Sequence, residues 1–273
     1  SVPSRHTSYR LDLLDLNYVY MPWISPTFKH DYIDSVSNRN AILRYNYEDL
    51  FIMKLGLAMV YNYGDNAFRM NIETAGNVLN GMAHTLNLHR NDEGHYTFIN
   101  IAYAQYVKFD FDYTHSVHFD TNNSLVLHGD FGIAYPYGNS DILPFEKRYF
   151  SGGANSVRGW GVRELGPGSY KGQNGRIDFI NQTGDMKLTM NVEYRSSLFW
   201  KFEGAAFIDA GNIWTLRNYA DQPGGQFKFD KFYKQIAVSY GLGLRLNFNY
   251  FILRLDGGMK AVNPSYESNA EHF

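Results

Sequence analysis

Apolar and polar residues alternate strictly over positions 185–196. Even positions from Met186 to Tyr194 are apolar, and odd positions from Asp185 to Arg195 are polar or charged. Positions 238–248 repeat the pattern, with Val, Tyr, Leu and Phe set against Ser, Gly, Arg and Asn. A side-chain period of two predicts β-strands with one apolar and one polar face. Charged residues along whole strands on the polar face, opposite Leu, Met and Tyr, are typical of a transmembrane β-barrel whose apolar face contacts lipid.

The same reading along the whole chain predicts about nine strands, separated by connections that are alternately short and long. The short connections fall near 64–66, 115–123, 199–200 and 249–250, and the long ones at 22–39, 81–96, 136–184 and 215–234. Barrels of the outer membrane have short periplasmic turns and long extracellular loops, so 136–184 is expected outside or folded back into the lumen. The strands are predicted at 10–21, 40–63, 67–80, 97–114, 124–135, 185–198, 201–214, 235–248 and 251–262.

An odd number of strands indicates an incomplete barrel. Single-chain bacterial barrels have even strand counts, and an open edge in lipid leaves backbone groups unsatisfied. The ninth predicted strand runs outward and is followed by a polar tail at 263–273, where a returning strand is expected. We therefore expect residues 1–273 to form part of a larger barrel.

Composition supports a membrane barrel and excludes several other classes. Aromatic residues make up 17% of the chain, with 22 Tyr, and many lie at the ends of predicted strands, as in an aromatic girdle. The alternative is a soluble β-sandwich with a Tyr-rich core. A net charge of −2 gives no reason to expect nucleic acid, and the absence of Cys excludes disulfides and thiolate metal sites. The expected surroundings are outer-membrane lipids.

The sequence contains no recognisable catalytic or metal-binding arrangement. His115 and His128 lack a Ser/His/acid pattern and are expected to face a polar lumen. Asp110 and Asp112 lie on one strand, which supplies too few ligands for a cation site. We therefore expect no enzyme activity, no catalytic residue, no metal and no cofactor.

One segment of the long loop identifies a family. Residues 148–170 read RYFSGGANSVRGWGVRELGPGSY, in which a glycine pair precedes a Val-Arg-Gly-aromatic tetrad. This segment resembles the sixth-loop motif of the Omp85 superfamily, the BamA- and TamA-like assembly barrels of the surface antigen D15 type. The family prefers Phe or Tyr where this chain has Trp. The matching residues are Gly152, Gly153, Val157, Arg158, Gly159 and Trp160.

Two further segments resemble the same family. Residues 207–214 (FIDAGNIW) place an aspartate before Gly-Asn-aromatic, and the pair 241–245 and 253–256 is similar to the family's next hairpin. Together the three blocks imply the last part of a sixteen-stranded barrel without its final strand. The resemblance is strong over about 124–262. Relatives carry POTRA domains before the barrel, and none is recognised in residues 1–273.

The loop arginine has two candidate partners. Glu193 and Asp209 have inward parity on neighbouring predicted strands, and a guanidinium offers five fixed donors that match two carboxylates. The resemblance implies the same arrangement, with Arg158 docked on these inner-wall acids. The alternative is that Arg158 is a solvated loop residue and the two acids line a wet channel.

The resemblance implies a function in inserting or translocating other proteins at the bacterial outer membrane. The first and last strands of the complete barrel would pair weakly and open a lateral gate that templates a client strand. Implied partners are unfolded outer-membrane protein clients, with accessory periplasmic or lipoprotein subunits as a further option. The alternative function is a passive pore or a transporter of the two-partner secretion type.

Overall fold

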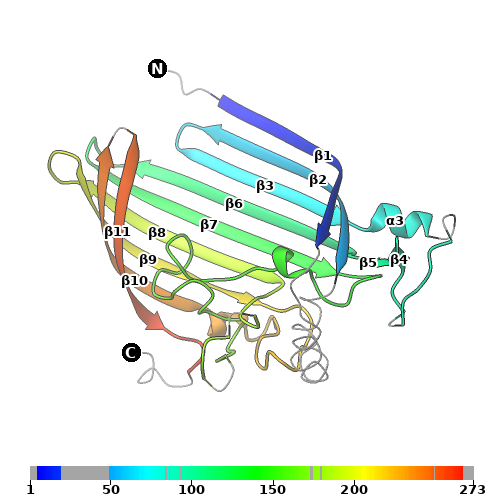
Figure 1. Ribbon diagram of the computed structural model, residues 1–273. Coiled ribbons are helices and arrows are strands. Elements are labelled where there is room, and N and C mark those ends of the chain that lie inside the picture. The colour runs from blue at the N-terminus through cyan, green and yellow to red at the C-terminus, as the bar shows by residue number, and fades with distance from the viewer. Residues whose placement is uncertain are drawn as a thin grey trace.

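The chain forms one curved sheet in which all the long strands are antiparallel. The computed structural model describes residues 5–19 and 49–266, apart from 84, 86, 93, 173–174, 179 and 249. Consecutive long strands lie side by side, in the up-and-down order predicted for a barrel wall (Figure 1). The predicted all-β antiparallel fold is confirmed. The long strands are β1 (Arg5–Val19), β2 (Leu50–Tyr63), β3 (Asn66–Ala75), β6 (Tyr106–His118), β7 (Asn123–Pro136), β8 (Met186–Ser197), β9 (Phe202–Trp214), β10 (Ala237–Phe248) and β11 (Phe251–Val262).

Several predicted strand limits are wrong, and the first strand begins at Arg5 rather than near residue 10. The strand expected to reach residue 80 ends at Ala75, because Gly76 has φ 74° and turns the chain into the short helix α3 (Asn77–Met82). The strand expected from residue 97 begins only at Tyr106. Before it lie two short strands, β4 (Thr97–Phe98) and β5 (Ile101–Tyr103), of which β5 pairs in parallel with β2. The predicted start of the second strand at 40 lies outside the described residues.

The two faces of the sheet differ as the alternation predicts. On β8, Met190 and Tyr194 are 54% and 42% exposed, whereas Thr189 and Glu193 are 1% and 6% exposed. The convex face thus presents large apolar side chains to its surroundings, while the concave face covers its polar side chains. An apolar face of this kind is stable only against lipid, and a soluble sandwich would cover it with a second sheet. No helix among the described residues has the length and apolar character needed to cross a membrane.

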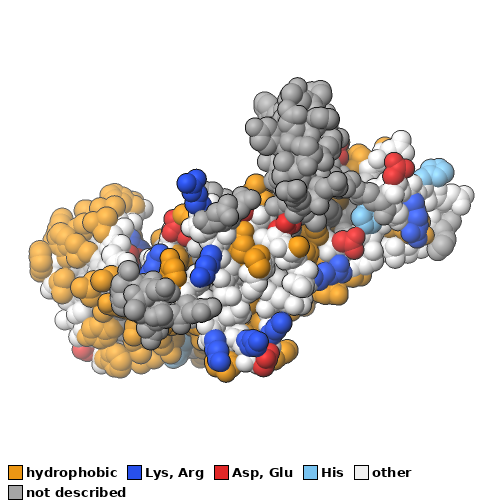
Figure 2. Space-filling view, turned by 90° about the horizontal axis from the view of Figure 1, so that it is seen from below, with side chains coloured by type: hydrophobic (Ala, Val, Ile, Leu, Met, Phe, Trp, Pro, Cys, Tyr) orange, Lys and Arg blue, Asp and Glu red, His pale blue; other side chains and the backbone are white. Residues whose placement is uncertain are grey.

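Short turns lie at one end of the sheet, and long connections lie at the other. β2 and β3 are joined by the two-residue turn Gly64-Asp65, in which Gly64 has φ 55°, as a tight hairpin requires. At the other end, the β7–β8 and β9–β10 connections lie below the sheet in Figure 1, and the β3–β6 connection with α3 lies to its right. Figure 2 views the molecule from below.

The long loop between β7 and β8 packs on the concave face. Its Leu143 and Tyr149 join a buried cluster with Tyr106 and Ala134 of the wall. Tyr149 also donates a hydrogen bond to Asp110 Oδ1 at 2.6 Å. Gly132 on β7 makes room for this ring, since a Cβ there would lie 2.6 Å from it. The sequence prediction of a long loop folded into the lumen is confirmed.

The sheet is not closed within the described residues. Among them, β1 pairs only with β2 along its length and β11 only with β10. The wall formed by β8–β11 is the part on which the loop motif lies.

Candidate functional site

The glycine pair folds the loop tightly around its motif. Gly152 and Gly153 have φ values of 95° and 89°, and the Gly153 amide donates a hydrogen bond to the Trp160 carbonyl at 2.8 Å. A Cβ on Gly152 would lie 2.1 Å from the Gly161 carbonyl oxygen. Only glycine combines this backbone conformation with this close approach. The turn presents residues 157–160 to the inner wall.

Arg158 binds both predicted acids. Its Nε and Nη2 donate to the two carboxylate oxygens of Asp209 at 2.8 and 2.7 Å, and its Nη1 donates to Glu193 Oε2 at 2.6 Å. The Arg158 amide also donates to Asp209 Oδ2 at 3.0 Å. The side chains of Arg158, Glu193 and Asp209 are 5%, 7% and 0% exposed. Such charge-assisted, bidentate bonds are among the strongest polar contacts in proteins. We name these three residues, together with Asp256, the Arg158 site.

Further charged residues of the wall complete the Arg158 site. Asp256 on β11 lies 3.5 Å from Arg158 Nη1, so the arginine contacts acids on β8, β9 and β11. Arg245 and Arg195 contact Glu193 Oε1 at 2.8 and 2.6 Å, which balances its charge. The guanidinium also lies 3.4 Å from the centroid of the Phe207 ring, in a cation–π contact. One loop residue thereby connects neighbouring strands of the wall.

The rest of the tetrad forms an apolar contact beside the arginine. Val157 is fully buried and Trp160 is 4% exposed, and both pack with Leu165 and Ala237. Gly159 lies against the wall, since a Cβ there would be 2.7 Å from Ser239 Cβ. The tryptophan therefore fills an apolar position beside Arg158.

Inward-facing glycines of β10 and β11 clear the space that the loop occupies. A Cβ on Gly258 would lie 2.5 Å from the Arg158 carbonyl oxygen, and one on Gly241 would lie 2.5 Å from the Phe207 ring. Gly257 of β11 takes no part in this packing. That residue has outward parity, and its nearest neighbour would be 3.9 Å away.

A series of side-chain hydrogen bonds extends the Arg158 site along the wall. Asn191 donates from Nδ2 to Asp209 Oδ1 and to the Ser156 carbonyl, each at 2.8 Å. Its Oδ1 lies 2.8 Å from His128 Nδ1, and His128 Nε2 lies 2.8 Å from Asp112 Oδ2. His128 therefore faces the lumen, as predicted. The prediction for His115 is wrong, because it shares the outward face of β6 with Tyr113, on which it stacks.

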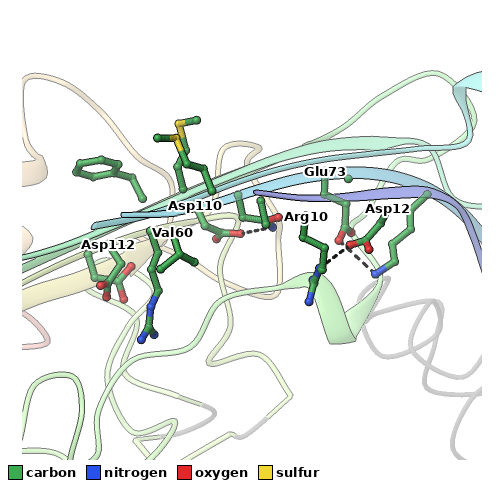
Figure 3. Close-up of a pocket in the computed structure, with 15 residues that line it drawn as sticks. Arg10, Asp12, Val60, Glu73, Asp110 and Asp112 are labelled. Atoms are coloured by element: carbon green, nitrogen blue, oxygen red, sulfur yellow. Dashed lines mark hydrogen bonds and ion pairs between the residues drawn. The ribbon is translucent and has the colours of Figure 1, made fainter. Parts of the chain in front are cut away.

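A second loop cation contacts the other half of the wall. Lys147 Nζ lies 2.7 Å from Glu73 Oε1, and Tyr106 donates to the same oxygen at 2.5 Å. Glu73 belongs to a row of charged residues on the concave face that line a cavity of about 270 Å³. Figure 3 shows several of these side chains on one side of the sheet, namely Arg10, Asp12, Glu73, Asp110 and Asp112. We name Lys147 and Glu73 the Lys147 site.

The start and end of the loop are joined by a buried pair outside the strands. Arg148 Nη2 lies 3.7 Å from Asp185 Oδ1, and both side chains are fully buried. Burial raises the pKa of the Asp185 carboxyl, which the charge of Arg148 opposes, and burial lowers the pKa of Arg148. Asp185 also accepts a hydrogen bond from the Leu216 amide at 3.0 Å, which connects the loop to the β9–β10 connection.

Sequence reasoning identified two of the acids but missed part of the site. Arg245 and Asp256 also have inward parity on predicted strands, and this signal could have named them as candidates. Their contact with Glu193 and Arg158 depends on the register of β10 and β11, which alternation alone does not give. Asn191 on β8 and Phe207 on β9 were also missed, although each lies two residues from a predicted acid and shares its inward parity.

The fold and the site define a class of protein: a transmembrane β-barrel wall whose inner face binds a long loop through an arginine. A family model described as the Omp85 superfamily domain matches residues 27–273. The chain belongs to the Omp85 superfamily, and it is an outer-membrane protein of bacteria.

Individual relatives cover limited parts of the molecule. Over 107 residues the chain is 32% identical to the outer membrane protein assembly factor BamA of Neisseria meningitidis serogroup B. The matched segment covers 36% of this chain and 12% of that protein. A solved structure of BamA from Haemophilus ducreyi lacking POTRA domains 1–3 is 13% identical, with a TM-score of 0.47, over 77% of this chain and 51% of that one. A solved structure of CdiB from Acinetobacter baumannii is 16% identical, with a TM-score of 0.46, over 78% of this chain and 30% of that one. The chain thus spans no more than about half the length of each relative.

Proposed function

We propose that this protein assembles or translocates other proteins at the outer membrane, without making or breaking a covalent bond. Membership of the Omp85 superfamily supports this proposal, as does identity to a segment of a protein named as an assembly factor. Its partners would be membrane lipids and unfolded outer-membrane protein clients, with accessory periplasmic or lipoprotein subunits as an option. The single observation that carries the mechanism is the contact of Arg158 with acids on three strands.

In this mechanism the Arg158 site fixes the shape of one half of the barrel wall. The loop arginine bridges β8, β9 and β11, so these strands keep their curvature while another part of the barrel opens. An opened pair of strands exposes backbone donors and acceptors, on which a client strand can add by β-augmentation. The wall near the Arg158 site stays rigid while strands elsewhere separate. Without such a fixed segment, the strands of an opened barrel would lose their pairing register.

The test is assisted folding of a small outer-membrane barrel in liposomes that contain the full-length protein. The R158A variant should fold into the membrane itself but lower the rate of client folding by roughly tenfold or more, the factor that corresponds to about 1.4 kcal/mol. R163A is the matched control, since Arg163 lies in the same loop and its guanidinium lies over the rings of Phe145 and Phe150. Wild-type activity in R158A would remove the proposed role.

The second candidate is passive conduction or export of a substrate through the lumen. A cavity of about 1070 Å³ between the loop and the wall favours it, because it is lined by charged side chains such as Lys108, Asp130 and Lys187. Conductance of the purified protein in planar bilayers separates the two functions. Large, steady conductance without assisted folding of the test barrel would favour the pore, and the converse would favour assembly.

A further inference from the structure

The β9–β10 connection carries an unusual group of aromatic and basic residues. Residues 226–236 read QFKFDKFYKQI, with three lysines against one aspartate. We name this segment the aromatic-basic loop. It is held to the end of β9, where the Phe227 amide donates to the Thr215 carbonyl at 2.8 Å. It lies at the end of the sheet where the long connections gather, the extracellular end of an outer-membrane barrel.

Trp214 shows on which side of the wall this loop lies. On β9, Trp214 has the parity of Ile208, which is 56% exposed on the lipid-facing side. Trp214 is nevertheless fully buried, because Phe227 and Phe232 pack edge-on against it at 5.7 and 6.5 Å and Gln235 accepts a hydrogen bond from its Nε1 at 2.9 Å. The aromatic-basic loop therefore covers the outward face of the wall, at the edge of the lipid-facing band.

The same loop presents a second set of aromatic rings to its surroundings. Phe229 is 86% exposed and packs edge-on against Phe227 at 5.0 Å. Tyr233 is 58% exposed and contacts Phe232 in the same way. Large aromatic rings exposed at the edge of the lipid-facing band favour the region where lipid headgroups meet acyl chains. The inner rings hold the outer rings in place.

The lysines of the loop have no acidic partner among the described residues. Lys228, Lys231 and Lys234 are exposed, and the structure places no carboxylate of the described chain within ion-pair distance of them. Their ammonium groups alternate with the rings along the segment. From the loop end, basic side chains lie beside hydrophobic ones along the lower rim of the molecule (Figure 2). Cations beside interfacial rings fit anionic headgroups.

We propose that the aromatic-basic loop binds phosphorylated glycolipids of the outer leaflet. The exposed rings of Phe229 and Tyr233 enter the headgroup region, and the three ammonium groups contact the phosphates. An acidic protein partner would pair with the lysines, but it would not account for aromatic rings exposed on the outward face of the wall. This inference depends on the barrel facing lipid and is independent of the assembly function proposed above.

The test is lipid binding to the full-length protein in detergent, followed by native mass spectrometry. The probes are bisphosphorylated lipid A, phosphatidylglycerol and phosphatidylcholine. The wild-type protein should bind lipid A more tightly than either other lipid, and added salt should weaken that binding. The triple variant K228Q/K231Q/K234Q should lower the lipid A affinity by at least about tenfold. F229S/Y233S should lower it as well, through loss of the rings.

Matched variants keep the result interpretable. K171Q/K201Q removes two lysines outside the aromatic-basic loop, and Y250S removes a ring that is 98% exposed at the opposite end of the sheet. Both should bind lipid A within about twofold of wild type, because neither changes the loop. Equal binding of lipid A and phosphatidylcholine by the wild type would overturn the proposal. So would preference for phosphatidylglycerol, or a triple variant that behaves like K171Q/K201Q.

Discussion

The long loop is attached to the wall at two cationic sites that differ in construction. At the Arg158 site, one guanidinium contacts acids of three strands, and every exposed fraction in that set is 9% or less. At the Lys147 site, one ammonium contacts Glu73 of a single strand, and Lys54 shares that acid at 3.6 Å. The first site joins strands to each other through the loop. The second joins the loop to one strand.

The difference follows from the two side chains. The planar guanidinium has fixed donors that can bind several oxygens at set angles, whereas an ammonium is a flexible point charge. Replacing an arginine that binds carboxylates on different strands therefore changes the geometry of the wall. Replacing a lysine changes only the strength of one contact. The comparison predicts that β8–β11 form the rigid part of the wall and that β1–β3 are less constrained by the loop.

The largest effect is expected from D209A. This substitution leaves Arg158 buried without its main partner and should lower the free energy of unfolding by about 3–5 kcal/mol. Urea titration of the full-length protein in lipid vesicles, followed by tryptophan fluorescence, measures the loss. D130A is the control, because Asp130 pairs with Lys187 on the same face but both side chains are 22% exposed. We expect about 1 kcal/mol or less for D130A. Equal losses in the two variants would contradict the contrast.

Exchanging the two cations tests the contrast directly. R158K keeps the positive charge but loses the planar guanidinium. The free energy of unfolding should fall by about 1–3 kcal/mol, because donors to Asp209 and Glu193 are lost. K147R keeps a donor for Glu73 and should cost less than about 1 kcal/mol. The same urea titration measures both. A K147R loss that equals or exceeds the R158K loss would show that geometry is not what distinguishes the sites.

Alternation along the strands predicted most of the fold, because a lipid-facing wall imposes a period of two on every strand. It also gave the inward parity of Glu193 and Asp209. It did not give α3, which depends on the left-handed conformation of Gly76. His115 was misplaced because the strand was predicted to end at residue 114, whereas β6 continues to His118 and the alternation then puts His115 on the outward face. The contacts of Arg245 and Asp256 depend on pairing between β10 and β11, whose register only the folded hairpin sets.

The smallest effect is expected at the edge of the Arg158 site. Asn191 donates to Asp209 and to the Ser156 carbonyl, and its Oδ1 contacts His128 Nδ1, so N191L removes three hydrogen bonds without removing a charge. We expect a loss of about 1–2 kcal/mol in the same titration. N191D should cost more, because its carboxylate would face two acceptors. N71L is the control, since Asn71 makes one longer bond to Asp110, at 3.3 Å. If N191L and N71L lose the same amount, Asn191 does not support Asp209, and the rigid part of the wall rests on the arginine alone.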